Sequence, residues 1–189
     1  GGPQEVGTSY DISGADLTSL EGLAQGITKS FYLSSPNLTS LEGMPRQLKG
    51  SCYLLSLGIT SLKGAPEVVG GTLKINHCLK LTTLQGCPQK VGSFGISSCP
   101  AVKSLEGGPQ VVKKSYKVWY SPITSLRGMP SRVGQEISLW TELLTSLDGF
   151  PQDFAGSLKL GCNVHDIKAL PRNLQNLEIW WHDDLPLLQ

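Results

Sequence analysis

The sequence predicts a β-rich solenoid, a single parallel sheet of about nine short strands connected by turns and irregular return segments. The first observation is a six-residue phrase, LTSLEG, which stands at residues 17–22 and 38–43 and then returns in altered forms such as ITSLKG and LTSLDG. The second is the nearly constant spacing of these copies, 21 to 23 residues. The third is a short alternation of apolar residues before each copy. A fixed period in this range is typical of repeats that stack on one another.

The repeated phrase predicts one buried column for each apolar position. Its second leucine falls at Leu20, Leu41, Leu62, Leu84, Leu105, Leu126 and Leu147, with a looser copy at Leu170. The alternating pairs are Tyr10/Ile12, Phe31/Leu33, Cys52/Leu54, Leu73/Ile75, Phe94/Ile96, Tyr116/Val118, Ile137/Leu139, Leu158/Leu160 and Leu177/Ile179. Period-2 alternation over so few residues indicates a short strand with one buried face. Because one repeat cannot bury these side chains alone, we expect the strands to stack at about 4.8 Å per repeat.

Glycine, proline and serine mark the turns of each repeat. The glycine that ends the phrase suits a backbone with positive φ. A proline follows it by two residues at Pro45, Pro66, Pro88, Pro109, Pro130 and Pro151. Proline donates no ladder hydrogen bond, so it belongs on the return segment, outside the sheet. The serine before the second leucine can bond to backbone groups of the turn. The phrase is therefore predicted to be structural.

The arrangement of strand, LTSLEG turn and P-x-x-V return resembles a short leucine-rich repeat. It is especially similar to variants in phage-encoded and environmental bacterial proteins, and more distantly to the repeat domains of secreted bacterial effectors. The resemblance implies a curved solenoid that binds other macromolecules. It departs from the commonest leucine-rich repeat at the position where Asn side chains usually form a ladder. The residues at that position here are Ala15, Pro36, Leu57, Cys78, Cys99, Ser121, Glu142, Asn163 and His182.

The two ends of the chain deviate from the repeat. Residues 1–6, GGPQEV, align with the return segment of a preceding repeat, so the solenoid predicted over residues 1–175 opens mid-repeat. Residues 176–189 are expected to hold the last strand and the start of a C-terminal cap or of a truncated extension. Solenoid ends need a covering cap, so we expect further residues or another chain at the N-terminal end.

Composition gives little reason to expect chemistry. The net charge is +1, and no apolar run reaches the roughly 20 residues that span a bilayer. Five cysteines occur without a CxxC or CxxH pair, so neither a disulfide framework nor a zinc site is indicated. His77, His165 and His182 fall on different repeats without a nucleophile motif, and His182-Asp183-Asp184 is interpreted as a solvated turn. We therefore expect no catalytic residue, metal or cofactor. Cys78 and Cys99 share a column on adjacent repeats and are expected to be two buried thiols, although the spacing also allows a disulfide.

Charge is distributed unevenly although its sum is small. Residues 103–132 contain six bases and one acid, and residues 136–189 contain eight acids and three bases. Two interpretations stay open: solvated loop charge, or a field that orients a partner.

The outward side chains of the strands form the candidate interaction site. Alternation places Lys117 and Trp119 on the open face of the sheet, and the column of Trp119 also holds Trp140, Gly161 and Trp180. Because two repeat spacings separate Trp140 from Trp180, we expect a gap of roughly 10 Å, wide enough for one inserted ring and edged by Lys117 and Lys159. The alternative is that the indoles lie on one another and cover the sheet. The remaining candidate residues for partner binding are Tyr53, Lys74 and Tyr120.

The sequence therefore predicts a non-enzymatic scaffold that binds a protein through its strand-lined face. A glycan- or receptor-binding module is the alternative, since exposed aromatic rings also suit sugars. Nucleic-acid binding through the basic middle repeats is a weaker alternative, and no membrane association is expected. The absence of paired cysteine motifs favours a reducing compartment, the host cytoplasm for a phage-encoded protein, with a virion or secreted location as alternatives.

Overall fold

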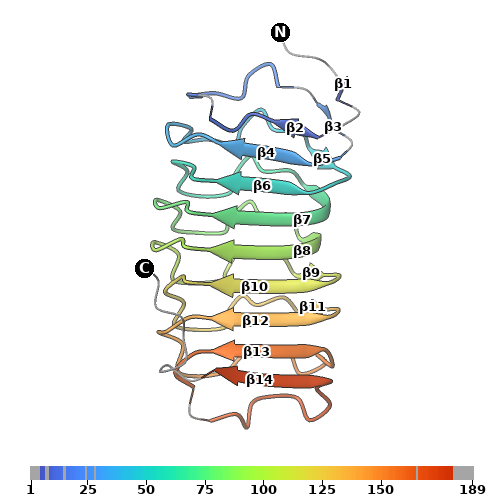
Figure 1. Ribbon diagram of the computed structural model, residues 1–189, viewed down its shortest axis with the longest axis vertical. Helices are drawn as coiled ribbons and strands as arrows, with labels where there is room; N and C mark the ends of the chain where they lie inside the picture. The colour runs from blue at the N-terminus through green and yellow to red at the C-terminus, as the bar shows by residue number, and fades with distance from the viewer. Residues whose placement is uncertain are drawn as a thin grey trace.

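The computed structural model describes residues 5–6, 9–14, 16–23, 25–27, 29–164 and 166–180. Within these ranges every regular element is a β-strand. Nine of the strands form one continuous parallel path: β2 (Tyr10–Asp11), β4 (Phe31–Ser34), β6 (Cys52–Leu55), β7 (Val68–Asn76), β8 (Lys90–Ser97), β10 (Ser115–Trp119), β12 (Glu136–Trp140), β13 (Ser157–Gly161) and β14 (Asn176–Trp180). Figure 1 shows them stacked along the long axis of the molecule. The prediction of a β-solenoid with a parallel sheet of about nine short strands is confirmed.

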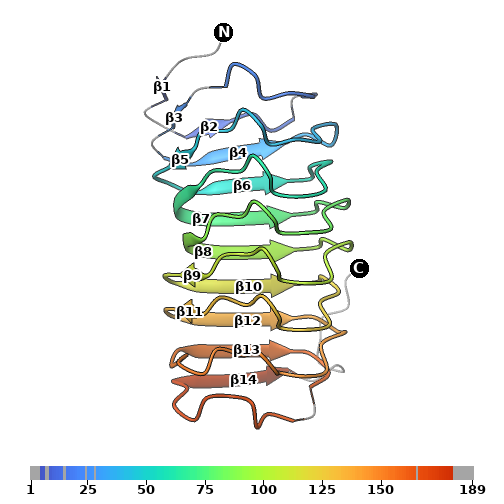
Figure 2. The same ribbon diagram turned by 180° about the vertical axis from the view of Figure 1, so that it is seen from behind.

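The return segments lie behind the sheet and pair with one another over short stretches (Figure 2). They contribute the two-residue strands β1 (Glu5–Val6), β3 (Gly26–Ile27), β5 (Gln47–Leu48), β9 (Val111–Val112) and β11 (Arg132–Val133). β1 pairs with β3. The strands β7 and β8 are long enough to continue from the return segment into the main sheet, and there β5 pairs with β7 and β9 with β8, while β11 pairs with β9. We call one main strand with the turn and return segment that follow it a rung. No helix in the described part of the chain is long and apolar enough to cross a lipid bilayer.

The register of the main strands aligns the apolar columns that the repeat predicts. Leu54 pairs with Ile75, Ile75 with Ile96, and Ile96 with Val118, and all four side chains are buried. The leucine column of the repeated phrase is equally buried from Leu20 to Leu147. The solenoid therefore has one continuous core between the sheet and the return segments, and each rung is covered by its neighbours.

The repeated phrase forms the same tight turn in successive rungs. The serine hydroxyl accepts a hydrogen bond from the backbone N–H two residues later, as in Ser40 to Glu42 at 3.1 Å and Ser104 to Glu106 at 3.2 Å. The terminal glycine has a φ between 81° and 96° in seven copies, from Gly22 to Gly149. Both features agree with the structural role predicted for the phrase.

A second column of left-handed residues appears directly after the strands, and here the residues are not glycine. Ser56, His77, Ser98 and Tyr120 have φ between 50° and 55°. Their side chains leave the core, and the next residue in each rung is buried instead: Leu57, Cys78, Cys99 and Ser121. In rungs without this conformation, the residue directly after the strand enters the core, as Ser35, Thr141 and Cys162 do. The sequence predicts that the residues from Ala15 to His182 at the usual Asn-ladder position form one column. In the described rungs they do not, because the sign of φ after the strand decides which of two neighbouring residues faces inward.

All five cysteines are buried free thiols. The expectation of two buried thiols at Cys78 and Cys99 is confirmed. A hydrogen bond between them lowers the pKa of the Cys78 thiol, and the same bond, together with burial, raises the pKa of the Cys99 thiol. Burial raises the pKa of Cys52 to about 12. Buried protonated thiols act as small apolar side chains that fill the core.

One core side chain carries a polar atom that the fold leaves unsatisfied. The ring of Tyr116 stacks on Phe94 with 5.3 Å between the ring centroids, and the side chain is fully buried. Its hydroxyl has no hydrogen-bond partner among the described residues, and burial raises its pKa. A buried hydroxyl without a partner costs roughly 1–3 kcal/mol.

We therefore expect Tyr116→Phe to stabilise the protein by about 1 kcal/mol, because it removes the unsatisfied hydroxyl and keeps the ring. Urea unfolding followed by circular dichroism measures the change. Tyr32→Phe is the matched control, since Tyr32 is half-buried on the outward face, and its effect should be close to zero. A destabilised Tyr116→Phe variant would show that the hydroxyl has a bonding partner in solution.

Candidate interaction face

The outward side of the main sheet carries the predicted site residues in two adjacent columns. Register pairs Trp119 with Trp140, Trp140 with Gly161, and Gly161 with Trp180. The neighbouring column places Lys117, Ser138, Lys159 and Glu178 on the same four strands. The structure therefore brings six predicted residues together over β10 to β14, and we call Trp119, Trp140 and Trp180 the tryptophan cluster. Trp180 is 41% exposed, while Trp119 and Trp140 are half-buried.

The indoles of Trp140 and Trp180 close over the rung between them. Their ring centroids lie 5.9 Å apart with 36° between the ring planes, although two rung spacings separate the backbones. The prediction of an open gap of about 10 Å at Gly161 is therefore wrong. Because Gly161 has no side chain to hold the rings apart, the two indoles lean together over it. The alternative, in which the indoles cover the sheet, describes this pair better.

Trp119 is held by two contacts of its own. Its indole N–H donates a hydrogen bond of 2.9 Å to the hydroxyl of Ser138, and the ammonium of Lys117 lies 5.5 Å from its ring centroid. Ser138 is only 1% exposed although it lies on the outward face. The side chains around it therefore cover this part of the sheet, and the two contacts fix the orientation of the Trp119 indole.

The lysines beside the cluster are paired with glutamates. Lys117 lies 2.7 Å from Glu136, and Lys159 lies 3.4 Å from Glu178. The sequence predicts that the two lysines edge a gap, and the glutamates are not among the predicted site residues. The sequence contains a signal for these pairs, since Glu136 and Glu178 each occupy an outward position on the strand next to that of the lysine. The tryptophan cluster is thus surrounded by compensated charge.

The other predicted residues lie away from the cluster. Tyr53 stacks on Tyr32 with 4.5 Å between centroids and 3° between planes, and Tyr32 is not among the predicted site residues. Lys74 is exposed on the next strand. Three rungs, about 14 Å, separate Tyr53 from Trp119 along the sheet. Tyr120 follows Trp119 in the left-handed turn and therefore lies beyond the strand end, at the edge of the face.

The histidines and acidic residues of the described part of the chain do not form a metal centre. Within them, no group of three or more His, Cys, Asp and Glu side chains is arranged to hold a metal ion. His77 Nδ1 lies 3.0 Å from the side-chain oxygen of Asn76 on the outer surface. His165 and the His182-Asp183-Asp184 turn lie outside the described residues, so their interpretation stays a prediction.

The fold and the face together define a parallel β-solenoid repeat protein with an aromatic outward surface. Comparison with protein-family models, curated proteins and solved structures finds no match. The resemblance to leucine-rich repeats thus rests on the repeat pattern of strand, LTSLEG turn and P-x-x-V return.

Proposed function

We propose that this protein is a non-enzymatic recognition scaffold that binds a protein partner through the tryptophan cluster. The observation that carries the proposal is the placement of three tryptophans on the solvent side of the sheet, where their side chains are not part of the hydrophobic core. Large aromatic side chains that stay accessible on a rigid element are typical anchors of protein interfaces. The Trp119 indole, whose orientation two contacts fix, also loses little side-chain entropy on binding.

The charge around the cluster favours a protein over a nucleic acid. Phosphate backbones bind to uncompensated lysine and arginine. Lys117 and Lys159 instead form ion pairs, so this part of the face offers apolar area and neutralised polar groups. Such a composition agrees better with the aromatic centre and polar rim of a protein interface.

A glycan is the second candidate, favoured by a different part of the outward face. Between the stacked Tyr32–Tyr53 pair and Trp119, strand β8 presents Gly95 with open space above it, since an added Cβ there would meet only the Lys74 side chain, at 3.9 Å. Sugar rings stack on aromatic side chains and bond to the small polar groups beside them. Binding of defined oligosaccharides to an array, lost in Tyr53→Ala and retained in Trp140→Ala, would support this candidate.

The test of the proposal is the substitution Trp140→Ala. We expect partner affinity to fall at least about thirtyfold, the loss typical of an interface anchor worth 2 kcal/mol or more. The measurement is quantitative capture of host proteins on immobilised wild type and variant, followed by titration of each captured protein. Gly161→Leu should have a similar effect, because a side chain there would separate the indoles of Trp140 and Trp180.

The matched control is Leu143→Ala, an exposed turn residue on the same rung and outside the outward face. It should leave capture unchanged, and circular dichroism should show all three variants folded. Capture of the same proteins with equal affinity by wild type and Trp140→Ala would contradict the proposal and move the site to another face.

The five buried thiols are compatible with a reducing compartment, so we propose the cytoplasm as the location. The phage-like repeat phrase supports a host-cell cytoplasm in particular.

A further inference from the structure

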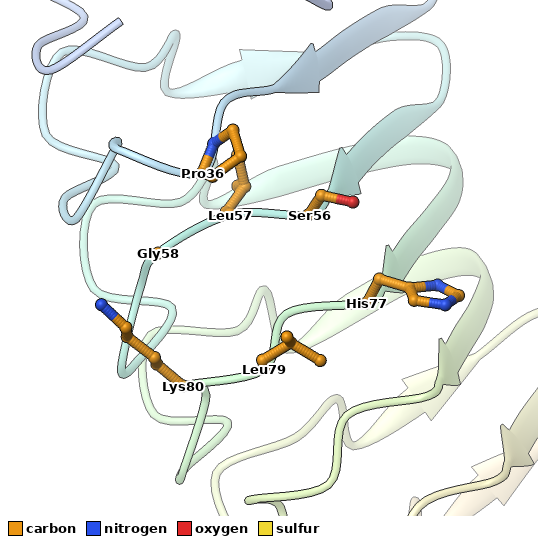
Figure 3. A pocket seen from close by; sticks show the side chains of 7 residues that line it. All are labelled: Pro36, Ser56, Leu57, Gly58, His77, Leu79 and Lys80. Carbon is orange, nitrogen blue, oxygen red and sulfur yellow. The ribbon is translucent and has the colours of Figure 1, made fainter. Parts of the chain in front are cut away.

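A small hollow lies at the turn edge of the solenoid, away from the tryptophan cluster. It is lined by Pro36, Ser56, Leu57, Gly58, His77, Leu79 and Lys80, and we call it the step pocket. Figure 3 shows these residues on three successive turns. Its volume of about 240 Å³ is below the roughly 300–1,000 Å³ typical of small-molecule sites. The step pocket is therefore sized for one side chain rather than for a whole cofactor.

The pocket exists because two neighbouring turns differ in length. Five positions lead from Leu54 to the buried Ile59, but six lead from Ile75 to the buried Leu81. The longer turn carries Leu79, whose side chain is 62% exposed and lines the pocket. A change of turn length between stacked rungs thus leaves a step with an apolar wall.

Glycine keeps the hollow open on its other side. A Cβ on Gly58 would overlap the carbonyl oxygen of Pro36, so only glycine allows these two turns to approach. The left-handed conformations of Ser56 and His77 turn both side chains away from the core toward the rim. Strained backbone of this kind is often found at binding sites. The result is an apolar floor with a polar rim.

The chain around the pocket carries more basic than acidic residues, and Lys80 lies in the pocket lining. Residues 42–106 contain seven lysines and arginines and three acidic residues, Glu42, Glu67 and Glu106, which gives a net charge of +4. Glu67 lies 3.8 Å from Arg46 on a return segment. In the part of the chain that the structure describes, Lys63, Lys80 and Lys103 have no ion-pair partner and are exposed. Charge complementarity therefore favours an acidic ligand.

We propose that the step pocket is a second binding site, which takes one apolar side chain of an acidic peptide segment. The apolar side chain packs against Leu57, Leu79 and Pro36, and neighbouring carboxylates face Lys80 at the rim. This site does not depend on the outward face, and either site can be present without the other.

The experiment uses three capped pentapeptides titrated into the full chain labelled with ¹⁵N. Their sequences are Glu-Glu-Leu-Glu-Glu, the same peptide with Ser in place of Leu, and Lys-Lys-Leu-Lys-Lys. We expect saturable amide shifts at Ser56, Leu57, His77 and Lys80 with the first peptide only. The affinity for this peptide should fall as the salt concentration is raised, because salt screens exposed charges. Absence of saturable shifts, or equal shifts with the Ser or the Lys peptide, would overturn the proposal.

Two variants test the pocket itself. Leu79→Glu and Lys80→Glu alter exposed side chains, so both should keep the wild-type fold, and each should weaken the acidic peptide at least tenfold. Leu143→Glu is the matched control, an equally charged change at an exposed leucine in another turn, and should alter affinity less than twofold. Binding unaffected by Leu79→Glu, or weakened as much by Leu143→Glu, would show that the peptide binds elsewhere.

Discussion

Leu105→Ala is expected to lower the free energy of unfolding by about 2–5 kcal/mol, the range for removing a fully buried leucine. Leu105 is stacked in its column between Leu84 and Leu126, and all three are buried. In a solenoid each rung contacts only its neighbours, so no distant part of the chain can compensate for the cavity. Guanidinium unfolding followed by circular dichroism measures the loss.

The control for this variant is the adjacent residue. Glu106 is exposed and lies 2.6 Å from Arg127, a surface ion pair that contributes little. Glu106→Gln should therefore change the free energy of unfolding by less than about 0.5 kcal/mol. Similar small effects for the two variants would mean that Leu105 is not in the core column, and that the assigned register is wrong.

Gly128→Ala is expected to be at least as damaging, and by a different mechanism. Gly128 has a φ of 89°, which costs a residue with a Cβ roughly 1–2 kcal/mol. An added Cβ would also overlap backbone atoms of Leu105 and Glu106 on the preceding rung. Because backbone cannot move aside as a flexible side chain does, we expect a total loss above about 3 kcal/mol.

Gly149→Ala separates the two contributions. Gly149 ends a copy of the same phrase and has a φ of 90°, but an added Cβ would lie 3.7 Å from its nearest neighbours in Leu126. It should therefore show only the conformational cost of about 1–2 kcal/mol. Thermal and denaturant unfolding of the two variants side by side give the comparison. Equal losses would mean that the rungs around Gly128 are less tightly stacked than in the structure.

The candidate face was predictable in part. Alternation along the strands placed Trp119, Trp140 and Trp180 in one outward column, and the register agrees. The contacts within that column were not predictable, because the side-chain torsions of each indole depend on the space that the side chains of the neighbouring rungs leave free. The closure of Trp140 on Trp180 and the pairing of Lys117 with Glu136 follow from such local choices.

The step pocket was also predictable only in part from the sequence. The one-residue change in repeat spacing between Leu62 and Leu84 is visible in the sequence, and it marks the longer turn. The residue type of Ser56 gives no signal for a positive φ, and that of His77 gives only a weak one, since histidine is enriched in this conformation but seldom adopts it. The hollow depends on both features and on the close approach of Gly58 to the preceding turn.

By itself, the sequence determined the solenoid, its period, its strand register and the identity of the core columns. It could do so because the same short pattern recurs along the chain, and only parallel stacking buries every copy at once. Only the tertiary structure decided which of two neighbouring residues enters the core after each strand and which lysines form ion pairs. It also decided that the indoles of Trp140 and Trp180 lie together and that a pocket forms at the turns. These outcomes depend on the sign of φ after each strand and on side-chain torsions set by contacts between rungs, and a turn that is longer by one residue changes them.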